Sequence, residues 1–150
     1  MSTPATKICI ADDESRGRQL LTDLLAPEGY QLIHATDGVE AVAVVLREEP
    51  DLVLLDVMMP RMNGYEVCRR LRADERMRQV PILLLTALDD RRSRMEGLEA
   101  GADDFLTKPV DGMELRTRVR TITRLNRFRL LFDQRERFVA ALTEEGYPPA

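Results

Sequence analysis

Five short apolar runs, separated by longer amphipathic stretches, constrain the fold of this chain more than any other feature. The runs are Lys7 to Ala11, Tyr30 to Ala35, Leu52 to Leu55, Ile82 to Leu85 and Phe105 to Thr107. Between the runs, apolar residues recur at steps of three and four, which predicts helices that each bury one stripe. A strand-then-helix rhythm of this kind is typical of a parallel sheet covered by helices.

The third and fourth runs indicate where the centre of the sheet lies. Leu52 to Leu55 and Ile82 to Leu85 are apolar at every position, as expected of parallel strands that are covered on both faces. Crossover connections between parallel strands are right-handed. The sequence therefore predicts an α/β fold with a doubly wound five-stranded parallel sheet.

Bulk properties narrow the class of protein. The chain of 150 residues is about one domain long, and it has no apolar run approaching the roughly 18 residues of a membrane span. Its first residues lack the apolar core of a secretory signal, so we expect a cytoplasmic protein. The net charge of −4 argues against a nucleic-acid partner. Cys9 and Cys68 belong to no metal-binding pattern and are expected to be reduced core residues.

Polar residues follow the predicted strands where each strand ends. Asp12 and Asp13 follow the first run, Asp56 follows the third, Thr86 follows the fourth, and Lys108 follows the fifth. In doubly wound folds the ligand site lies beyond the carboxyl ends of the strands. We therefore expect these residues to converge at one edge of the sheet.

The expected cluster combines three carboxylates with one ammonium group. Like charges about 5 Å apart repel by roughly 3 kcal/mol at an effective dielectric constant of 20, so a cation is needed. Oxygen ligands of this kind suit Mg²⁺, with Mn²⁺ as an alternative. Beside such a metal, the Asp56 carboxylate can act as a nucleophile toward phosphorus. Lys108 and the Thr86 hydroxyl can then bind phosphoryl oxygens.

Four motifs resemble the receiver domain of bacterial two-component response regulators. They read IADDE at 10–14, LVLLDVMMPRMNGYEVC at 52–68, PILLLTALDD at 81–90 and GADDFLTKP at 101–109. The resemblance covers about the first 120 residues and implies a flavodoxin-like sheet of strand order 2-1-3-4-5. It also implies a phosphorelay switch whose phosphoryl donor is a sensor histidine kinase or a histidine phosphotransfer protein.

The resemblance assigns roles to individual residues. Asp56 would be the phosphoacceptor. Asp13, Asp56 and the backbone carbonyl of Met58 would bind the metal directly, and Asp12 would act through water. Thr86 and Lys108 would contact the phosphoryl group. A switch would couple movement of Thr86 to rotation of the Phe105 ring.

Two other function classes fit the sequence less well than this interpretation does. Phosphatases of the haloacid dehalogenase type need a second acid two residues after the nucleophile, and that position is Met58 here. We therefore expect no enzyme activity beyond self-phosphorylation and slow self-dephosphorylation. A DNA-binding regulator would need an effector domain, which the roughly 25 residues after the fifth helix are too few to form. The chain could instead be the receiver portion of a longer multidomain regulator.

The C-terminal part of the sequence predicts one long helix. Asp111 is a candidate N-cap, and no Pro or Gly occurs from Met113 to Glu145. Residues 6–123 would form the receiver domain, residues 124–145 a helical extension, and residues 146–150 a flexible terminus. Aromatic residues of the extension would be exposed, so residues 124–142 are expected to pair with a second copy as a homodimer or with a partner helix.

Overall fold

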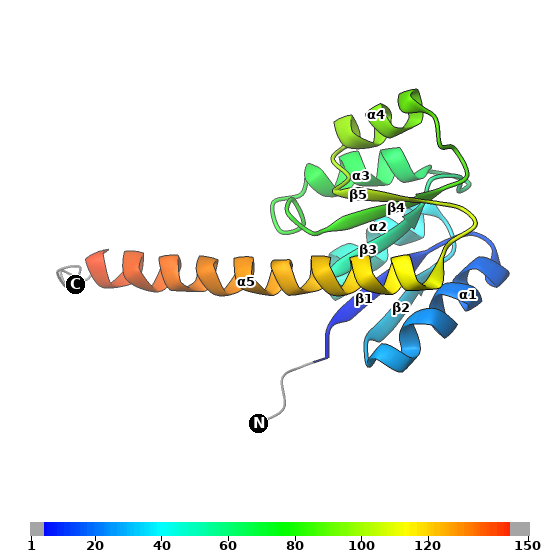
Figure 1. The fold of residues 1–150 in the computed structure, drawn as a ribbon. Coiled ribbons are helices and arrows are strands. Elements are labelled where there is room, and N and C mark those ends of the chain that lie inside the picture. The colour runs from blue at the N-terminus through cyan, green and yellow to red at the C-terminus, as the bar shows by residue number, and fades with distance from the viewer. Residues whose placement is uncertain (1–4, 145–150) are drawn as a thin grey trace.

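The sheet of this protein lies between two layers of helices. The computed structural model describes residues 5–144. Its strands are β1 (Lys7–Ala11), β2 (Gln31–Ala35), β3 (Leu52–Asp56), β4 (Ile82–Thr86) and β5 (Asp104–Thr107). They are parallel, in the order β2-β1-β3-β4-β5 (Figure 1). The predicted fold class and strand order are confirmed, and each strand boundary differs by at most one residue from the prediction.

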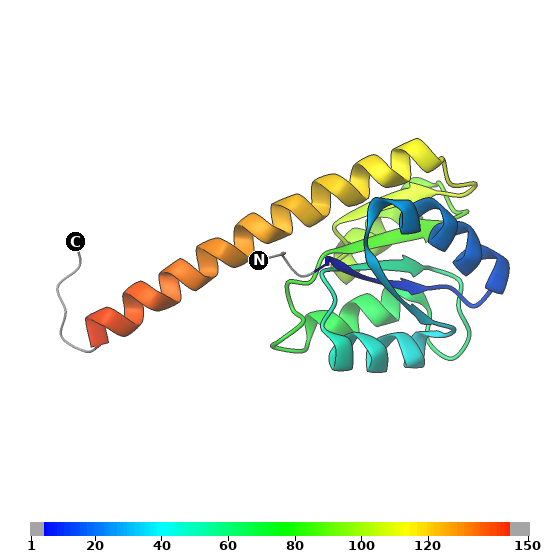
Figure 2. The same ribbon diagram turned by 90° about the horizontal axis from the view of Figure 1, so that it is seen from below.

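Five α-helices connect and cover the strands. They are α1 (Ser15–Leu25), α2 (Gly38–Glu48), α3 (Gly64–Arg72), α4 (Arg91–Ala100) and α5 (Gly112–Glu144), with a short 3₁₀ turn at Ala26–Glu28. Helices α1 and α5 cover one face of the sheet, and α2, α3 and α4 cover the other (Figure 2). Within the described part of the chain, no helix has the length and hydropathy needed to cross a membrane.

Side chains that alternate along the strands point to opposite faces of the sheet and contribute to two hydrophobic cores. On β1, Ile8 and Ile10 pack toward α1 and α5, while Cys9 and Ala11 pack toward α2 and α3. The residues of β3 and β4 are buried at every position, because these strands have neighbours on both sides and helices on both faces. Burying each such leucine stabilises the fold by about 1.5–3 kcal/mol relative to exposure. Strong burial therefore fixes β3, which ends at Asp56.

Side-chain caps start three of the described helices, which follow β2, β3 and β5 in the chain. Asp37 accepts a hydrogen bond from the Glu40 amide, and Asn63 accepts one from the Glu66 amide. Asp111, the predicted N-cap of α5, accepts one from the Glu114 amide at 3.0 Å. Each cap is worth about 1 kcal/mol and limits where its helix can begin. The caps therefore define where the loops at this edge of the sheet end.

Helix α5 extends well beyond the sheet, as the sequence predicted, and both ribbon views show its C-terminal half projecting from the body (Figures 1 and 2). Polar contacts hold the root of this projection. The Asn126 side chain donates to the Asp51 carbonyl at 3.4 Å, and Arg129 contacts Gln79. The predicted terminus 146–150 lies outside the described residues.

Both cysteines lie in the core, as predicted. Cys9 and Cys68 are buried and free. Burial raises the pKa of each thiol to about 12, so both remain protonated near neutral pH. These residues act as small apolar side chains.

Candidate functional site

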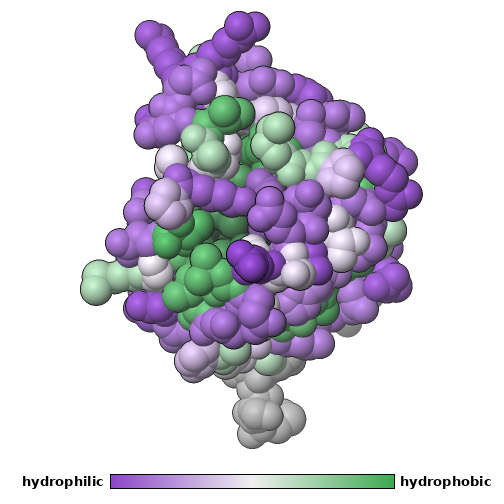
Figure 3. All heavy atoms as spheres, turned by 90° about the vertical axis from the view of Figure 1, so that its right-hand side faces the viewer, coloured by the Kyte–Doolittle hydropathy of each residue, from purple (hydrophilic) through white to green (hydrophobic). Residues whose placement is uncertain are grey.

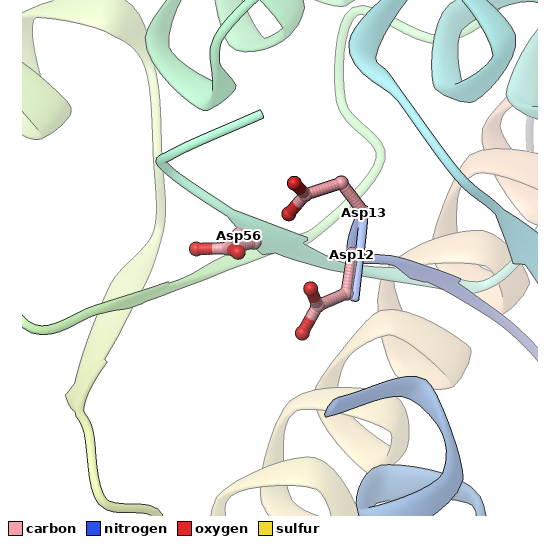
Figure 4. Close-up of side chains that lie close together, drawn as sticks. All are labelled: Asp12, Asp13 and Asp56. Atoms are coloured by element: carbon pink, nitrogen blue, oxygen red, sulfur yellow. The ribbon is translucent and has the colours of Figure 1, made fainter. Parts of the chain in front are cut away.

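Three carboxylates meet beyond the ends of β1 and β3. Oxygen atoms of Asp12, Asp13 and Asp56 all lie within 4.8 Å of one another (Figure 4). Asp12 and Asp56 are buried, with 1% and 5% of their surface exposed, whereas Asp13 is exposed. The parallel sheet aligns Ala11 with Leu55, which brings these residues from distant parts of the sequence to one edge.

Lys108 supplies a positive charge to the cluster. Its Nζ lies 3.3 Å from Asp56 Oδ2 and 3.7 Å from Asp12 Oδ2. A backbone hydrogen bond anchors it beside β4, because the Lys108 amide donates to the Thr86 carbonyl at 2.8 Å. The peptide bond from Lys108 to Pro109 is cis. Three carboxylates and one ammonium group leave two net negative charges. The predicted convergence of the four residues is confirmed.

The close approach of α3 to the end of β3 depends on Gly64, the first residue of α3. The Gly64 amide donates to the Val57 carbonyl at 2.9 Å. A Cβ atom on Gly64 would come within 2.6 Å of the Asp56 carbonyl oxygen, so only glycine allows α3 to begin this close to β3. The Met58 amide donates to Asp56 Oδ1 at 3.3 Å and orients the carboxylate.

The electrostatic environment of Asp56 is balanced between opposing effects. Burial raises the pKa of the Asp56 carboxyl, the Lys108 ammonium lowers it, and the Asp12 carboxylate raises it again. The net pKa lies above that of an ordinary aspartate. Because a buried and partly unbalanced carboxylate is costly, this site favours a bound cation over the empty state.

Thr86 and Phe105, the two predicted switch residues, lie on neighbouring strands. Thr86 is buried at the end of β4, and its Oγ1 accepts a hydrogen bond from the Leu88 amide at 2.9 Å. Phe105 is half-buried, and its ring lies against α4 so closely that a Cβ on Gly97 would overlap it. The structure therefore brings Thr86 to the edge of the site, while Phe105 lies earlier on β5 beneath α4.

Apolar side chains border the acidic cluster. Met58, in the loop after β3, is 66% exposed, and Leu88, in the loop after β4, is 44% exposed. Figure 3 views this face of the molecule and shows hydrophobic side chains gathered in hollows among hydrophilic ones. The site therefore offers apolar contacts around a charged centre.

Two residues that support Asp12 were missed from the sequence. Gly17 lies in α1, and a Cβ there would overlap Asp12 Oδ2 and lie 2.9 Å from its Cγ. Arg18 Nη1 donates to the Asp12 backbone carbonyl at 2.8 Å. A glycine inside a helix costs about 1 kcal/mol relative to alanine, and that cost was the available signal for a close approach. No sequence pattern points to a role for Arg18.

The chemistry of the cluster fits a hard divalent cation. The donors are carboxylate oxygens, and their spacing lets one ion contact several of them. The three carboxylates and the Lys108 ammonium group carry a net charge of −2, which one divalent cation neutralises. In the part of the chain that the structure describes, this is the group of acidic side chains close enough together to hold a metal.

Comparisons with known proteins agree with this geometry. The family model for the response regulator receiver domain matches residues 8–120. Response regulator PleD from Caulobacter vibrioides is 46% identical over 130 residues, which cover 87% of this chain and 28% of PleD. The probable transcriptional regulator ycf27 from Porphyridium aerugineum is 47% identical over 118 residues, 79% of this chain and 48% of that protein. The chain thus spans about half or less of these relatives.

Solved structures share the fold. The receiver domain of sensor histidine kinase PA1611 from Pseudomonas aeruginosa, with a magnesium ion in its active-site cleft, is 32% identical with a TM-score of 0.73; the match covers 81% of this chain and 98% of that one. A receiver domain of a histidine kinase from Syntrophus aciditrophicus is 39% identical with a TM-score of 0.74. The match covers 79% of this chain and 90% of that one. Fold, acidic cluster and sequence agree: the chain belongs to the response regulator receiver domain family.

Proposed function

We propose that this protein is a phosphorelay switch in which Asp56 accepts a phosphoryl group from a phosphohistidine on a partner protein. The observation that carries the proposal is the Asp56 carboxylate beside both Lys108 Nζ and two further carboxylates. An Asp56 oxygen attacks phosphorus, the phosphorus–nitrogen bond to the donor imidazole breaks, and that imidazole leaves and takes up a proton. The product is an aspartyl phosphate.

Binding of a divalent cation belongs to this proposal. Asp13, Asp56 and the Met58 backbone carbonyl would hold Mg²⁺, or Mn²⁺ in its place, with Asp12 acting through water. The ion supplies charge neutralisation on the phosphoryl oxygens during transfer. The magnesium ion in the PA1611 receiver domain supports this assignment.

Lys108 and Thr86 bind the phosphoryl group, and Phe105 responds to its presence. Lys108 Nζ lies 3.3 Å from Asp56 Oδ2, and it pairs with a phosphoryl oxygen once Asp56 is phosphorylated. The Thr86 hydroxyl, which accepts from the Leu88 amide, retains its own proton to donate to a second oxygen. Movement of Thr86 changes the space at the end of β4, and the Phe105 ring against α4 responds.

The partner proposed for the input step is a sensor histidine kinase or a histidine phosphotransfer protein of the cytoplasm. The exposed apolar side chains of Met58 and Leu88 offer such a partner contacts beside the reacting atoms. Residues 6–123 would carry this chemistry, and residues 124–145 would be a helical extension of the fifth helix. The protein would catalyse only its own phosphorylation and slow dephosphorylation, and would need no nucleic acid.

For the output we propose association through residues 124–142, with a second copy or with a partner helix. The exposed Phe128, Phe132 and Phe138 support an interface there. The alternative is that the chain is the receiver portion of a longer regulator, which the 28% coverage of PleD favours. In both cases the proposed role of the helical extension is to transmit the phosphorylation state of Asp56.

The test is the intact mass of the full chain after incubation with Mg²⁺ and acetyl phosphate. We expect one phosphoryl adduct that is absent from Asp56→Asn and from wild-type protein treated with a chelator. A Glu75→Gln variant, changed in an exposed acid outside the cluster, should form the adduct normally. An adduct that persists in Asp56→Asn would refute the assignment, and steady turnover of an added phosphate ester would favour a phosphatase instead.

A further inference from the structure

The exposed stripe on the C-terminal half of α5 has the spacing of a coiled-coil seam. Leu125, Phe128, Phe132, Arg135, Val139 and Leu142 follow one another at steps of three, four, three, four and three residues. This is the alternation of the a and d positions of a heptad repeat. Leu131 and Phe138 flank the stripe on one side, and Arg129 and Glu136 flank it on the other. One residue of the seam, Arg135, is charged.

The stripe and its apolar flank together expose most of the apolar surface that a stable interface needs. Phe128, Phe132 and Phe138 are 65%, 62% and 65% exposed. Since a phenylalanine buries up to about 200 Å², these three side chains alone offer roughly 400 Å², about half of the ~800 Å² that each partner contributes to a standard interface. Leu125 and Leu131, each at least 60% exposed, supply much of the remainder.

We infer that the partner is a second copy of this chain, whose α5 lies antiparallel to the first over residues 125–142. This inference rests on the association proposed above, and it specifies the binding partner and the relative orientation of the two helices. The paired stretch is about 26 Å long at 1.5 Å per residue. A two-fold axis relates the copies, so Leu125 lies opposite the partner's Leu142, and Phe128 lies opposite the partner's Val139.

The charged seam residue discriminates between the two orientations. A parallel pair in register would bring the two Arg135 side chains into one layer of the seam, where like charges repel. In the antiparallel pair, Arg135 instead lies opposite the partner's Phe132, where a guanidinium over an aromatic ring is attractive. The antiparallel arrangement also matches the large Phe128 with the small Val139, which favours even packing.

The flanking positions give the same preference. In the antiparallel pair the nearest flanking neighbour of Glu136 is the partner's Arg129, an opposite charge, and Leu131 meets the partner's Phe138. In the parallel pair, Arg124 and the partner's Arg129 would be flanking neighbours of the same charge. Arg129 already contacts Gln79 and Asn126, and its guanidinium has further donors for a carboxylate.

The root of the extension leaves room for the end of the partner helix. An open groove of about 560 Å³ lies beside α5 there, and its lining includes Pro81, Ile122, Leu125 and Asn126. Leu125 belongs to both the groove and the seam. The antiparallel pair brings the partner's Leu142 to this position, so the apolar part of the groove is covered by the helix end.

Sedimentation of the full chain tests whether a second copy is the partner. We expect dimers for wild type and for Gln134→Ser, a matched change at an exposed position outside the seam and its flanks. Phe132→Ser should weaken self-association at least tenfold while its circular dichroism and acetyl phosphate adduct remain normal. A wild-type monomer at all concentrations, with and without phosphorylation, would overturn this inference and the homodimer, yet would leave the chemistry at Asp56 standing.

Disulfide trapping tests the orientation. Cys9 and Cys68 are buried, so the one added thiol in each of the variants Phe128→Cys and Val139→Cys can be oxidised selectively. We expect covalent dimers when the two variants are mixed, and few when each is oxidised alone. A dimer that forms readily in Val139→Cys alone would show a parallel pair and overturn the antiparallel arrangement.

Discussion

Replacing Asp13 by asparagine should affect stability with opposite signs in the absence and presence of Mg²⁺. The substitution removes one charge from the cluster and keeps the size of the side chain. Asp13 faces two carboxylates whose oxygens lie within 4.8 Å, and Lys108 forms ion pairs with those two neighbours. Without metal the Asp13 charge is therefore repelled, whereas with metal it is needed.

The magnitude follows from Coulomb's law. Two unit charges at 4.8 Å repel by about 0.9 kcal/mol at the dielectric constant of water and by about 3.5 kcal/mol at an effective value of 20. Because Asp13 is exposed, the lower value is closer, and two neighbours give about 1–2 kcal/mol at low salt. With Mg²⁺ at a hundred times its dissociation constant, wild type gains about 2.7 kcal/mol that the variant largely loses.

Urea unfolding followed by circular dichroism measures both effects. In a chelator at low salt, Asp13→Asn should unfold at a urea concentration roughly 0.5–1 M higher than wild type, given a slope of about 2 kcal/mol per molar urea. In saturating Mg²⁺ the order of the midpoints should reverse. Glu75→Gln should behave as wild type in both conditions. An Asp13→Asn protein no more stable than wild type in chelator would refute the electrostatic reasoning.

Three further predictions follow from other contacts. Cys9 and Cys68, with pKa values near 12, should resist thiol reagents between pH 7 and 9 and react only after unfolding. The intact mass of the protein measures the labelling, and rapid labelling of the native protein would contradict the burial of the two thiols. Gly17→Ala should displace the Asp12 carboxylate and raise the dissociation constant for Mg²⁺ about tenfold, as measured by the Mg²⁺ concentration needed to stabilise the protein against urea. The urea midpoint without metal should change little, because alanine improves helix propensity. Arg72→Ala should cost about 2–4 kcal/mol of unfolding free energy in urea, since its guanidinium donates to three backbone carbonyls; a loss below 1 kcal/mol would disprove that role.

Local sequence information was sufficient for the elements of this fold. Continuous apolar runs predicted the central strands because both faces of β3 and β4 are buried, and the Asp111 cap predicted the start of α5 because capping depends on neighbours in sequence. Strand ends were predicted less well than strand centres: β2 begins at Gln31 rather than Tyr30, and β3 and β4 each end one residue later than predicted, at Asp56 and Thr86.

Pairings across the sheet were accessible only in part. That Asp12, Asp13, Asp56 and Lys108 would meet followed from the rule that parallel strands end at one edge, but the distances of 3.3 and 3.7 Å from Lys108 did not. The hydrogen bond of Thr86 to the Leu88 amide also required the structure.

The sequence by itself determined the order of strands and helices, the acidic and basic residues of the site, and the apolar stripe of the last helix, because each is a periodicity or a motif within a short stretch. Only the tertiary structure decided how closely α1 approaches Asp12 at Gly17, how Phe105 packs on Gly97, and where the groove beside Leu125 lies. Those features depend on the relative positions of elements far apart in the chain, and packing between them is set by the shapes of all the side chains in contact.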